Sequence, residues 1–310
     1  MHICFDLRKV QLDHLDRPVV TLGTFDGVHV GHQILIKQVV QKAQELKKKS
    51  VVVTYEPHPQ TVVSPQNAPL LLTTLEEKIP LLEQLGIDEL MIINFDQELS
   101  NFTPQEFIEE ILVKKLNPAQ VIVGYNHAFG KNREGKPENL KEAGDIYNFG
   151  FEMLEPVDIN DNDISSSKIR KELTLGNFRA AKKMLGHSYP IFGTVVFGAG
   201  LGQSLGYPTA NLSVAGNKLL PKSGVYSGKV QIENQTHFGM AYIGQRPTLN
   251  QKGIVIEAHI FNFEGNLYDR KIALYLDEYI REDQKFDSVQ DLKIQMQKDE
   301  VLVKQYYQLN

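Results

Sequence analysis

The first 186 residues alternate between strand-like and helix-like segments, and this alternation leaves few folds open to them. Four continuous apolar runs of strand length lie at residues 19–22, 51–55, 90–93 and 121–123. Amphipathic segments of helical length separate the runs, and two of these segments begin with capping boxes, at residues 74–77 and 103–106. Strands that are apolar on both faces and alternate with helices predict a parallel sheet with helices on both sides.

The pattern changes after residue 186. Short β-rich segments, separated by Gly, Pro, Asn and Asp, lie at residues 191–197, 225–232, 254–261 and 271–276. They predict a small antiparallel barrel or sandwich, with a hairpin turn at residues 263–267 and an amphipathic helix within residues 288–308. We therefore expect an α/β domain at residues 1–186 and a β domain with a terminal helix at residues 187–310.

Composition excludes several classes of protein. The formal net charge of −5 and the sequence pI near 6.0 give no general attraction to nucleic acid. Cys4 is the one cysteine, which excludes an internal disulfide. The first residues lack the layout of a signal peptide, and no apolar run approaches the roughly 18 residues of a membrane span. We expect a cytoplasmic protein with no nucleic-acid or membrane partner.

The segment GTFDGVHVGH, residues 23–32, follows the first apolar run and leads into a helical pattern. Unpaired backbone N–H groups and the helix dipole make a helix N-terminus a site for anions. His29 and His32 both fall at this N-terminus, so phosphate chemistry is the leading interpretation. Two other interpretations stay open. The pair could be a capping histidine beside a surface histidine, or a zinc site, although no Cys or Glu lies at a matching spacing.

Two further polar segments lie in the first half. Residues 124–133 follow an apolar run and end with the cations Lys131 and Arg133 in a glycine loop. Residues 164–170 contain three serines that can cap a helix, and Lys168 and Arg170 follow within its first turn. Cations there oppose the helix dipole unless an anion binds, which indicates a polyphosphate. The plainer alternatives are a solvated loop and an ordinary serine cap.

A glycine-rich segment at residues 198–212 marks the second half. Its glycines allow the backbone to approach a phosphate, and Thr209 and Asn211 offer oxygen ligands suited to magnesium. No Walker A or protein-kinase motif is present. Taken alone, the composition of this segment favours glycine turns in a hairpin-rich barrel, and Glu257 alone would be an ordinary strand carboxylate that faces water.

The motifs, taken in order, resemble those of bacterial bifunctional riboflavin kinase/FAD synthetases. Residues 20–186 resemble the FMN adenylyltransferase module, a Rossmann-like domain of the HxGH nucleotidyltransferases, through GTFDGVHVGH, VVVTYEPHPQTVV, VIVGYNHAFG and ISSSKIR. Residues 187–310 resemble the riboflavin kinase module through LGYPTANL, LLPKSGVYSG, YIGQRPT, IEAHIFNF, NLYDRKI and YIREDQKFDSVQDLKIQ.

This resemblance implies two reactions, both with Mg²⁺: riboflavin and ATP give FMN, and FMN and ATP give FAD and pyrophosphate. It implies ATP binding for adenylyl transfer at Gly23, Phe25, Asp26, His29, His32, Asn126, Ser166, Ser167 and Arg170. It implies that Mg–ATP for the kinase binds at Gly202, Gly206, Pro208, Thr209 and Asn211, with Thr209 and Asn211 as metal ligands. Glu257 would be the general base on the riboflavin hydroxyl, and Arg281 would lie near the flavin. A homo-oligomer is left open.

Three positions depart from the family pattern. His127 stands where an aromatic residue is usual, Gln203 where an arginine is usual, and Tyr242 where an asparagine is usual. Loss of a cation near the phosphates removes transition-state stabilisation. The alternative to a bifunctional enzyme is therefore an FAD synthetase whose second domain is a weak or inactive flavin-binding module. A flavin-sensing regulator without turnover is a third hypothesis.

Overall fold

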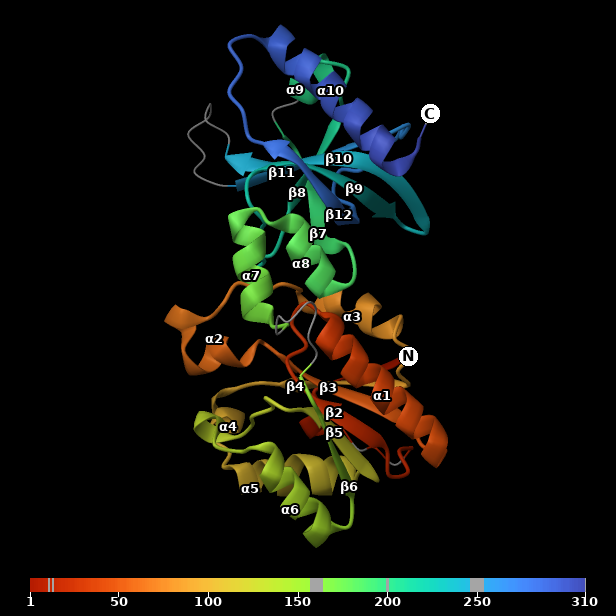
Figure 1. Ribbon diagram of the computed structural model, residues 1–310, viewed down its shortest axis with the longest axis vertical. Coiled ribbons are helices and arrows are strands. Elements are labelled where there is room, and N and C mark those ends of the chain that lie inside the picture. Colours follow the sequence, from red (N-terminus) through yellow and green to blue (C-terminus); the bar gives the residue numbers. More distant parts are fainter. Residues whose placement is uncertain (11, 13, 157–163, 199–200, 246–253, 310) are drawn as a thin grey trace. The chain divides into compact units, whose positions relative to one another are not determined.

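The computed structural model describes residues 1–10, 12, 14–156, 164–198, 201–245 and 254–309. The chain forms two compact units (Figure 1). The first contains Met1–Leu70 and Lys78–Ser165, and the second contains Leu71–Glu77 and Ser166–Asn310. The expected functional boundary at residue 187 stays a prediction. None of the helices in the described residues combines the length and apolarity needed to cross a membrane.

The first unit is built on a six-stranded parallel sheet with the order β1-β4-β3-β2-β5-β6. The strands are β1 (His2–Phe5), β2 (Val19–Leu22), β3 (Ser50–Glu56), β4 (Glu89–Asn94), β5 (Gln120–Gly124) and β6 (Gly150–Leu154). The parallel sheet and its four central strands were predicted, and the structure confirms them. The edge strands β1 and β6 were missed because most of their residues are not fully buried, so they lack a continuous apolar run.

Helices cover both faces of this sheet. On one face, alternate residues of the central strands form a core with the helical segments that follow Thr103 and with α6. On the other face, α1 contacts β2, β3 and β5. The helical elements are η1 (Leu7–Lys9), α1 (Val30–Leu46), α2 (Pro59–Val63), η2 (Pro65–Asn67), α4 (Gln97–Ser100), α5 (Pro104–Phe107), the π-helix η3 (Ile108–Leu116), η4 (Lys131–Arg133) and α6 (Pro137–Tyr147).

Both predicted capping boxes are present. Thr103 and Glu106 bond reciprocally at the start of α5. At the start of α3 (Leu75–Glu83), Thr74 N–H donates to Glu77 Oε2 at 2.8 Å, and Glu77 N–H donates to Thr74 Oγ1 at 3.4 Å. Helix α3 begins in the segment that belongs to the second unit and ends in the first.

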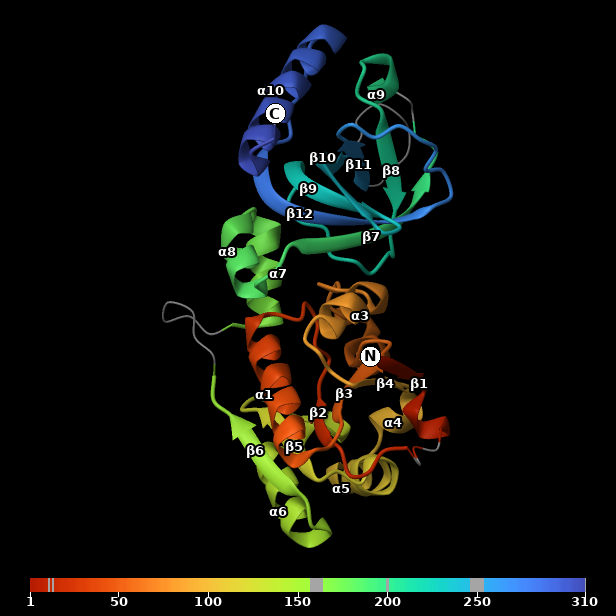
Figure 2. The ribbon, with the colours of Figure 1, turned by 90° about the vertical axis from the view of Figure 1, so that its right-hand side faces the viewer.

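The second unit is a closed six-stranded antiparallel barrel with the order β10-β11-β8-β7-β12-β9 (Figure 2). Its strands are β7 (Tyr189–Val196), β8 (Thr209–Ser213), β9 (Gly224–Ile232), β10 (Gln235–Gln245), β11 (Ile254–Ile260) and β12 (Lys271–Glu282). The predicted barrel is confirmed, but the predicted hairpin at residues 263–267 is wrong. Strands β11 and β12 on either side of it do not pair, whereas β9 and β10 form a hairpin with the two-residue turn 233–234.

Besides the first residues of α3, the described part of the second unit contains the helices α7 (Ser166–Leu175), α8 (Phe178–Leu185), α9 (Leu201–Ser204) and α10 (Val289–Tyr307). The predicted terminal helix is α10, capped by Ser288. It lies against the outside of the barrel (Figures 1 and 2), where Val303 packs with Tyr207, Met240 and Phe261.

Candidate active sites

The first candidate site lies where the strand order of the parallel sheet reverses. From β2 the chain passes to β3 and β4 on one side, then returns to place β5 on the other side of β2. In such sheets, ligands bind beyond the carboxyl ends of the strands at this switch point. The loop that contains His29 follows β2 and the loop that contains Asn126 follows β5, so both leave adjacent strands at that edge.

The loop between β2 and α1 has an unusual backbone. Phe25, Gly27 and Val28 have φ angles of 46°, 83° and 39°, in the left-handed region that side chains with a Cβ rarely adopt. Phe25 is fully buried, and a Cβ at Gly23 would lie 3.0 Å from its ring. The core thus holds the loop in a conformation that its own residues disfavour. Such backbone strain is often found at functional sites.

His29 and His32 lie at the N-terminus of α1, as predicted. His29 is the N-cap residue, and its Nδ1 accepts a hydrogen bond from the backbone N–H of His32 at 3.4 Å. The two rings stack with centroids 3.5 Å apart and planes 17° apart. His29 therefore does cap the helix, but His32 is no surface residue: its Nδ1 is buried and has no hydrogen-bond partner in the part of the chain that the structure describes.

Burial lowers the pKa of His32 well below its usual value, and His29 and Lys78 lower it further. A neutral imidazole with an unpaired nitrogen can form a hydrogen bond to an incoming phosphate oxygen. The arriving negative charge would in turn favour protonation of the ring.

Lys78 lies beside this candidate site, and the sequence analysis did not single it out. Its Nζ donates to the carbonyl of Thr24 at 2.6 Å and to Thr54 Oγ1 at 3.4 Å, beneath the loop before His29. Burial lowers the pKa of Lys78, while Asp26 and Glu56 oppose that effect. Nothing in the sequence marked Lys78, because its partners come from β3 and from a loop distant in the chain.

The second loop at this edge carries Asn126 and His127. Asn126 is exposed, and its amide oxygen lies 3.7 Å from the position a Cβ would take at Gly124. Burial, followed by the charge of Arg133, lowers the pKa of His127 to about 4. Its ring stacks on Phe129 with the ring centroids 5.8 Å apart, and its buried Nε2 bonds to none of the described residues.

The predicted pyrophosphate-binding residues lie on the second unit. Ser166, Ser167 and Arg170 all fall within the first five residues of α7. The predicted serine-led helix start is therefore confirmed. That these residues meet His29 and His32 around one nucleotide stays a prediction.

The second candidate site lies on neighbouring strands of the barrel. In the antiparallel register, Glu257 of β11 stands directly opposite Asn211 of β8, and His259 stands opposite Thr209. The alternate residues Ala210 and Ala258 are buried in the core, so Thr209, Asn211 and Glu257 share the other face of the sheet. The structure thus brings together the three side chains that the sequence predicted for the kinase.

Glycines in the segment before β8 allow its backbone to approach β8 closely. A Cβ at Gly198 would lie 2.2 Å from the amide nitrogen of Asn211. A Cβ at Gly202 would lie 2.3 Å from the carbonyl oxygen of Tyr207 and 3.2 Å from Thr209 Oγ1. Gly206 has a φ of 85°, and the carbonyl of Pro208 bonds to His259 Nδ1 at 2.8 Å. Ala199 and Gly200 of the same motif lie outside the described residues.

Arg281 and Tyr242 have protein partners beside this site. Arg281 bonds Asp299 of α10 through Nε and Nη2, both at 2.8 Å, so its predicted position near the flavin stays a prediction. Tyr242 pairs with Glu257 across β10 and β11, and its hydroxyl donates to Asp283 at 3.0 Å. Gln203 lies in α9, whereas Arg246, Pro247 and Thr248 of the motif YIGQRPT lie outside the described residues.

Comparison with known proteins shows the family to which the chain belongs. A family model described as FAD synthetase matches residues 12–168, and one described as Riboflavin kinase matches residues 185–307. A protein of Buchnera aphidicola subsp. Schizaphis graminum, named "Bifunctional riboflavin kinase/FMN adenylyltransferase", is 36% identical over 94% of this chain and 94% of its own length. The chain belongs to the bifunctional riboflavin kinase/FMN adenylyltransferase family.

Other members and a solved structure agree with this family. A Listeria monocytogenes protein of the same name is 35% identical over 91% of this chain and 90% of its own length. A crystal structure titled "Macrolide-efflux Protein from Streptococcus pneumoniae" is 30% identical, with a TM-score of 0.86, and covers 98% of this chain and 99% of that one. Its title names a different role, so we take from it only the fold; the family rests on the models and the curated relatives.

Enzymes of these two families use ATP, typically with a divalent metal ion. The barrel residues fit such an ion, because the Thr209 hydroxyl, the Asn211 amide oxygen and the Glu257 carboxylate are oxygen donors on one face of two paired strands. The close approach of Gly198 to Asn211 leaves room for backbone but none for a side chain.

Proposed function

We propose that the protein makes FAD from riboflavin in two steps at two sites. The barrel site transfers the γ-phosphoryl group of ATP to riboflavin and yields FMN. The site on the parallel sheet transfers AMP from a second ATP to FMN and yields FAD and pyrophosphate. The consumption of ATP in both steps favours the cytoplasm as the place of action.

In the adenylyl transfer, an oxygen of the FMN phosphate attacks the α-phosphorus of ATP, and the bond from that phosphorus to the bridging oxygen of pyrophosphate breaks. Such reactions depend on alignment and on neutralisation of charge rather than on a covalent intermediate. His29 and His32 would contact the reacting phosphates, Asn126 the nucleotide, and Ser166, Ser167 and Arg170 the leaving pyrophosphate. The stacked histidines at the switch point carry this part of the proposal.

In the kinase reaction, Glu257 would accept the proton of the riboflavin 5′-hydroxyl as its oxygen bonds to the γ-phosphorus of ATP, and ADP leaves. Thr209 and Asn211 would hold the Mg²⁺ that binds the ATP phosphates. The observation that supports this part is the direct pairing of Glu257 with Asn211, which brings a carboxylate next to the amide on neighbouring strands.

One experiment tests both activities. The protein is incubated with riboflavin, ATP and Mg²⁺, and the flavins are separated by chromatography. We expect FMN to appear first and FAD to follow. If neither flavin forms in the folded protein, the proposal is wrong; if FMN added directly is converted to FAD but riboflavin is not consumed, only the kinase half is wrong.

A matched pair of variants separates the two sites. Glu257→Gln keeps the shape of the side chain but removes the base, so riboflavin phosphorylation should fall by roughly 100-fold or more while FMN adenylylation persists. Glu264→Gln, an exposed residue between β11 and β12, is the control and should leave both rates unchanged. Loss of both activities in Glu257→Gln would rule out two independent sites.

A second candidate function is FAD synthesis alone, with the barrel as a flavin-binding module. The departures at Gln203 and Tyr242 favour it, since Tyr242 stands opposite Glu257 and is tied to Asp283. Burial and Asp283 raise the pKa of Tyr242, so its hydroxyl stays neutral. It therefore does not supply the positive charge of the arginine that is usual at the position of Gln203. Formation of FMN from riboflavin would exclude this candidate.

A further inference from the structure

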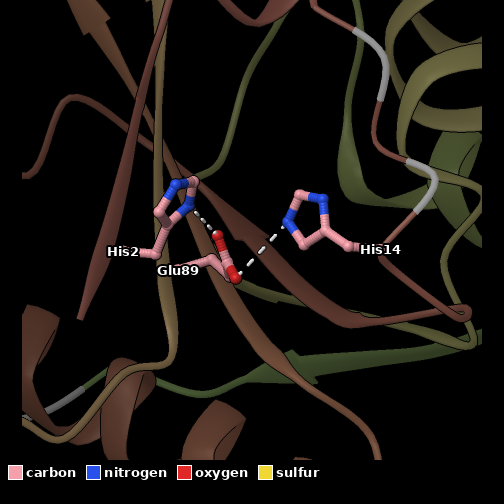
Figure 3. Close-up of side chains that lie close together, drawn as sticks. All are labelled: His2, His14 and Glu89. Carbon is pink, nitrogen blue, oxygen red and sulfur yellow. Dashed lines mark hydrogen bonds and ion pairs between the residues drawn. The ribbon is translucent and has the colours of Figure 1, made fainter.

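A cluster of two histidines and one glutamate lies on the first unit, apart from the residues considered so far. The carboxylate of Glu89 stands between the rings of His2 and His14 (Figure 3). His2 Nδ1 lies 2.6 Å from Glu89 Oε2, and His14 Nε2 lies 3.5 Å from Glu89 Oε1. The ring centroids of the two histidines are 5.8 Å apart.

The cluster joins three separate segments of the chain. His2 begins β1, Glu89 begins β4, and the two residues are register partners in the parallel sheet. His14 comes from the loop before β2. Because the strands are parallel, the beginnings of β1 and β4 lie at the edge of the sheet opposite the end of β2, where His29 follows. The cluster is therefore independent of the adenylyltransferase site.

We propose that His2, His14 and Glu89 bind a divalent transition metal ion, with Zn²⁺ as the ion that best fits. Two imidazole nitrogens and one carboxylate are ligands that zinc accepts, whereas magnesium prefers an all-oxygen set. This would distinguish the metal from the Mg²⁺ that accompanies ATP. Three protein ligands leave a fourth tetrahedral position for water.

The geometry fits a metal with small adjustments. Zinc bonds to nitrogen and oxygen are about 2.0–2.2 Å long, which places the ligand atoms of a tetrahedral site roughly 3.3 Å apart. The three ligand atoms of the cluster already lie within 4.8 Å of one another. Glu89 is the fixed member, with a side chain only 7% exposed, whereas His2 is 63% exposed and can rotate towards the metal.

An ion can reach the cluster from solvent, because the side chains of His2 and His14 are 63% and 48% exposed. His14 also lines a hollow of about 360 Å³, whose other charged residues are two acids and three lysines and which therefore does not itself select for cations: Asp16, Asp88, Lys47, Lys48 and Lys49. The bound ion would cross-link the edge strand β1, which has four residues, and the loop of His14 to β4. The ion would stabilise the folded protein, since a ligand that binds only the folded state stabilises that state.

Metal titration of the full, untagged chain tests the proposal. After treatment with EDTA, the protein is titrated with Zn²⁺ by calorimetry and with Co²⁺ by visible absorption, without nucleotide. We expect one equivalent to bind and to raise the midpoint of thermal unfolding. His2→Gln and His14→Gln should each lower the affinity by about tenfold or more, as loss of even an outer-shell partner does, and should reduce the thermal shift at a given Zn²⁺ concentration.

Two controls make the outcome decisive. His237→Gln alters a histidine of the barrel and should bind like the wild type. His29→Gln should also bind, which separates the cluster from the paired histidines at α1. Failure of the wild type to bind Zn²⁺ would overturn the proposal, in which case the cluster is an ion pair only. Undiminished binding by both His2→Gln and His14→Gln would overturn it as well.

Discussion

Two half-buried histidines at the carboxyl edge of the parallel sheet, His32 and His127, remain uncharged near neutral pH. Burial lowers both pKa values, and a neighbouring positive group adds to the effect in each case, Lys78 near His32 and Arg133 near His127. Each ring also has one buried nitrogen that finds no hydrogen-bond partner among the described residues. Unsatisfied polar atoms of this kind are costly unless a ligand pairs with them, so both rings are suited to contact a nucleotide.

His127 makes the stability of the first unit sensitive to acid. An unfolded histidine binds a proton near pH 6.5, but folded His127 does so only near a pKa of about 4. As pH falls below about 6.5, the unfolded state gains protons that the folded state does not, so stability present above that pH is lost progressively. The substitution His127→Phe keeps an aromatic ring stacked on Phe129 and removes the titratable imidazole.

Urea denaturation measures the difference. Between about pH 7 and about pH 5, the wild type should lose roughly 2 kcal/mol more unfolding free energy than His127→Phe, because each pKa unit corresponds to about 1.4 kcal/mol. Equal losses in the two proteins would show that the ring is not held neutral by the fold.

The segment before β8, which includes Gly202 of α9, lies against Thr209, and its position should therefore affect the rate of riboflavin phosphorylation. Ala at position 202 would press its Cβ against the Tyr207 carbonyl and move the segment, and Thr209 with it. Because small misplacements of reacting groups are costly, Gly202→Ala should lower riboflavin phosphorylation by roughly 100-fold. Gly216→Ala is the control, since no atom of the described residues lies within 4 Å of its Cβ position and the residue is exposed. Similar kinetics in the two variants would contradict the role given to the segment.

The elements that could be predicted are those whose signal is local. Strand β2 was predicted at its observed bounds because all four of its residues are buried, and both capping boxes were predicted because their partners are three residues apart. The misplaced hairpin shows the limit of such signals. Turn residues at 263–267 mark a reversal of the chain, but pairing depends on which strands lie side by side in the closed barrel.

The residues of the candidate sites also fall into two groups, those with a local sequence signal and those without one. His29, Thr209 and Asn211 could be singled out as candidate site residues because each belongs to a motif that is contiguous in the sequence. Lys78 went unnoticed because it reaches the site from α3, and the cluster of Glu89 went unnoticed because its members are joined by strand pairing. Long-range contacts of this kind leave no periodicity in the sequence.

On the scale of the whole molecule, the second unit includes a segment from far earlier in the chain. Lys218 donates to Glu77 Oε2 at 2.8 Å and to the carbonyl of Leu72 at 2.6 Å, and its Nζ lies 4.2 Å from the centroid of the Tyr189 ring. The other oxygen of Glu77 accepts from the backbone N–H of Phe192 at 2.9 Å. Both charged side chains are fully buried. A fragment of residues 187–310 would therefore carry Lys218 without Glu77.

Removal of one member of this pair should destabilise the barrel far more than removal of both. Lys218→Met or Glu77→Gln leaves a buried charge without its counter-ion, which costs about 3–5 kcal/mol. The double variant should cost less than the sum of the two, because neither charge remains. The exposed pair of Lys271 and Glu76, 2.7 Å apart and one residue away along α3, provides the control: Lys271→Met should cost about 1 kcal/mol or less. Chemical denaturation of the full chain, followed by limited proteolysis to locate the unit that opens, measures all four variants. Additive losses would mean that Lys218 and Glu77 act separately, and that residues 71–77 are not an energetic part of the barrel unit.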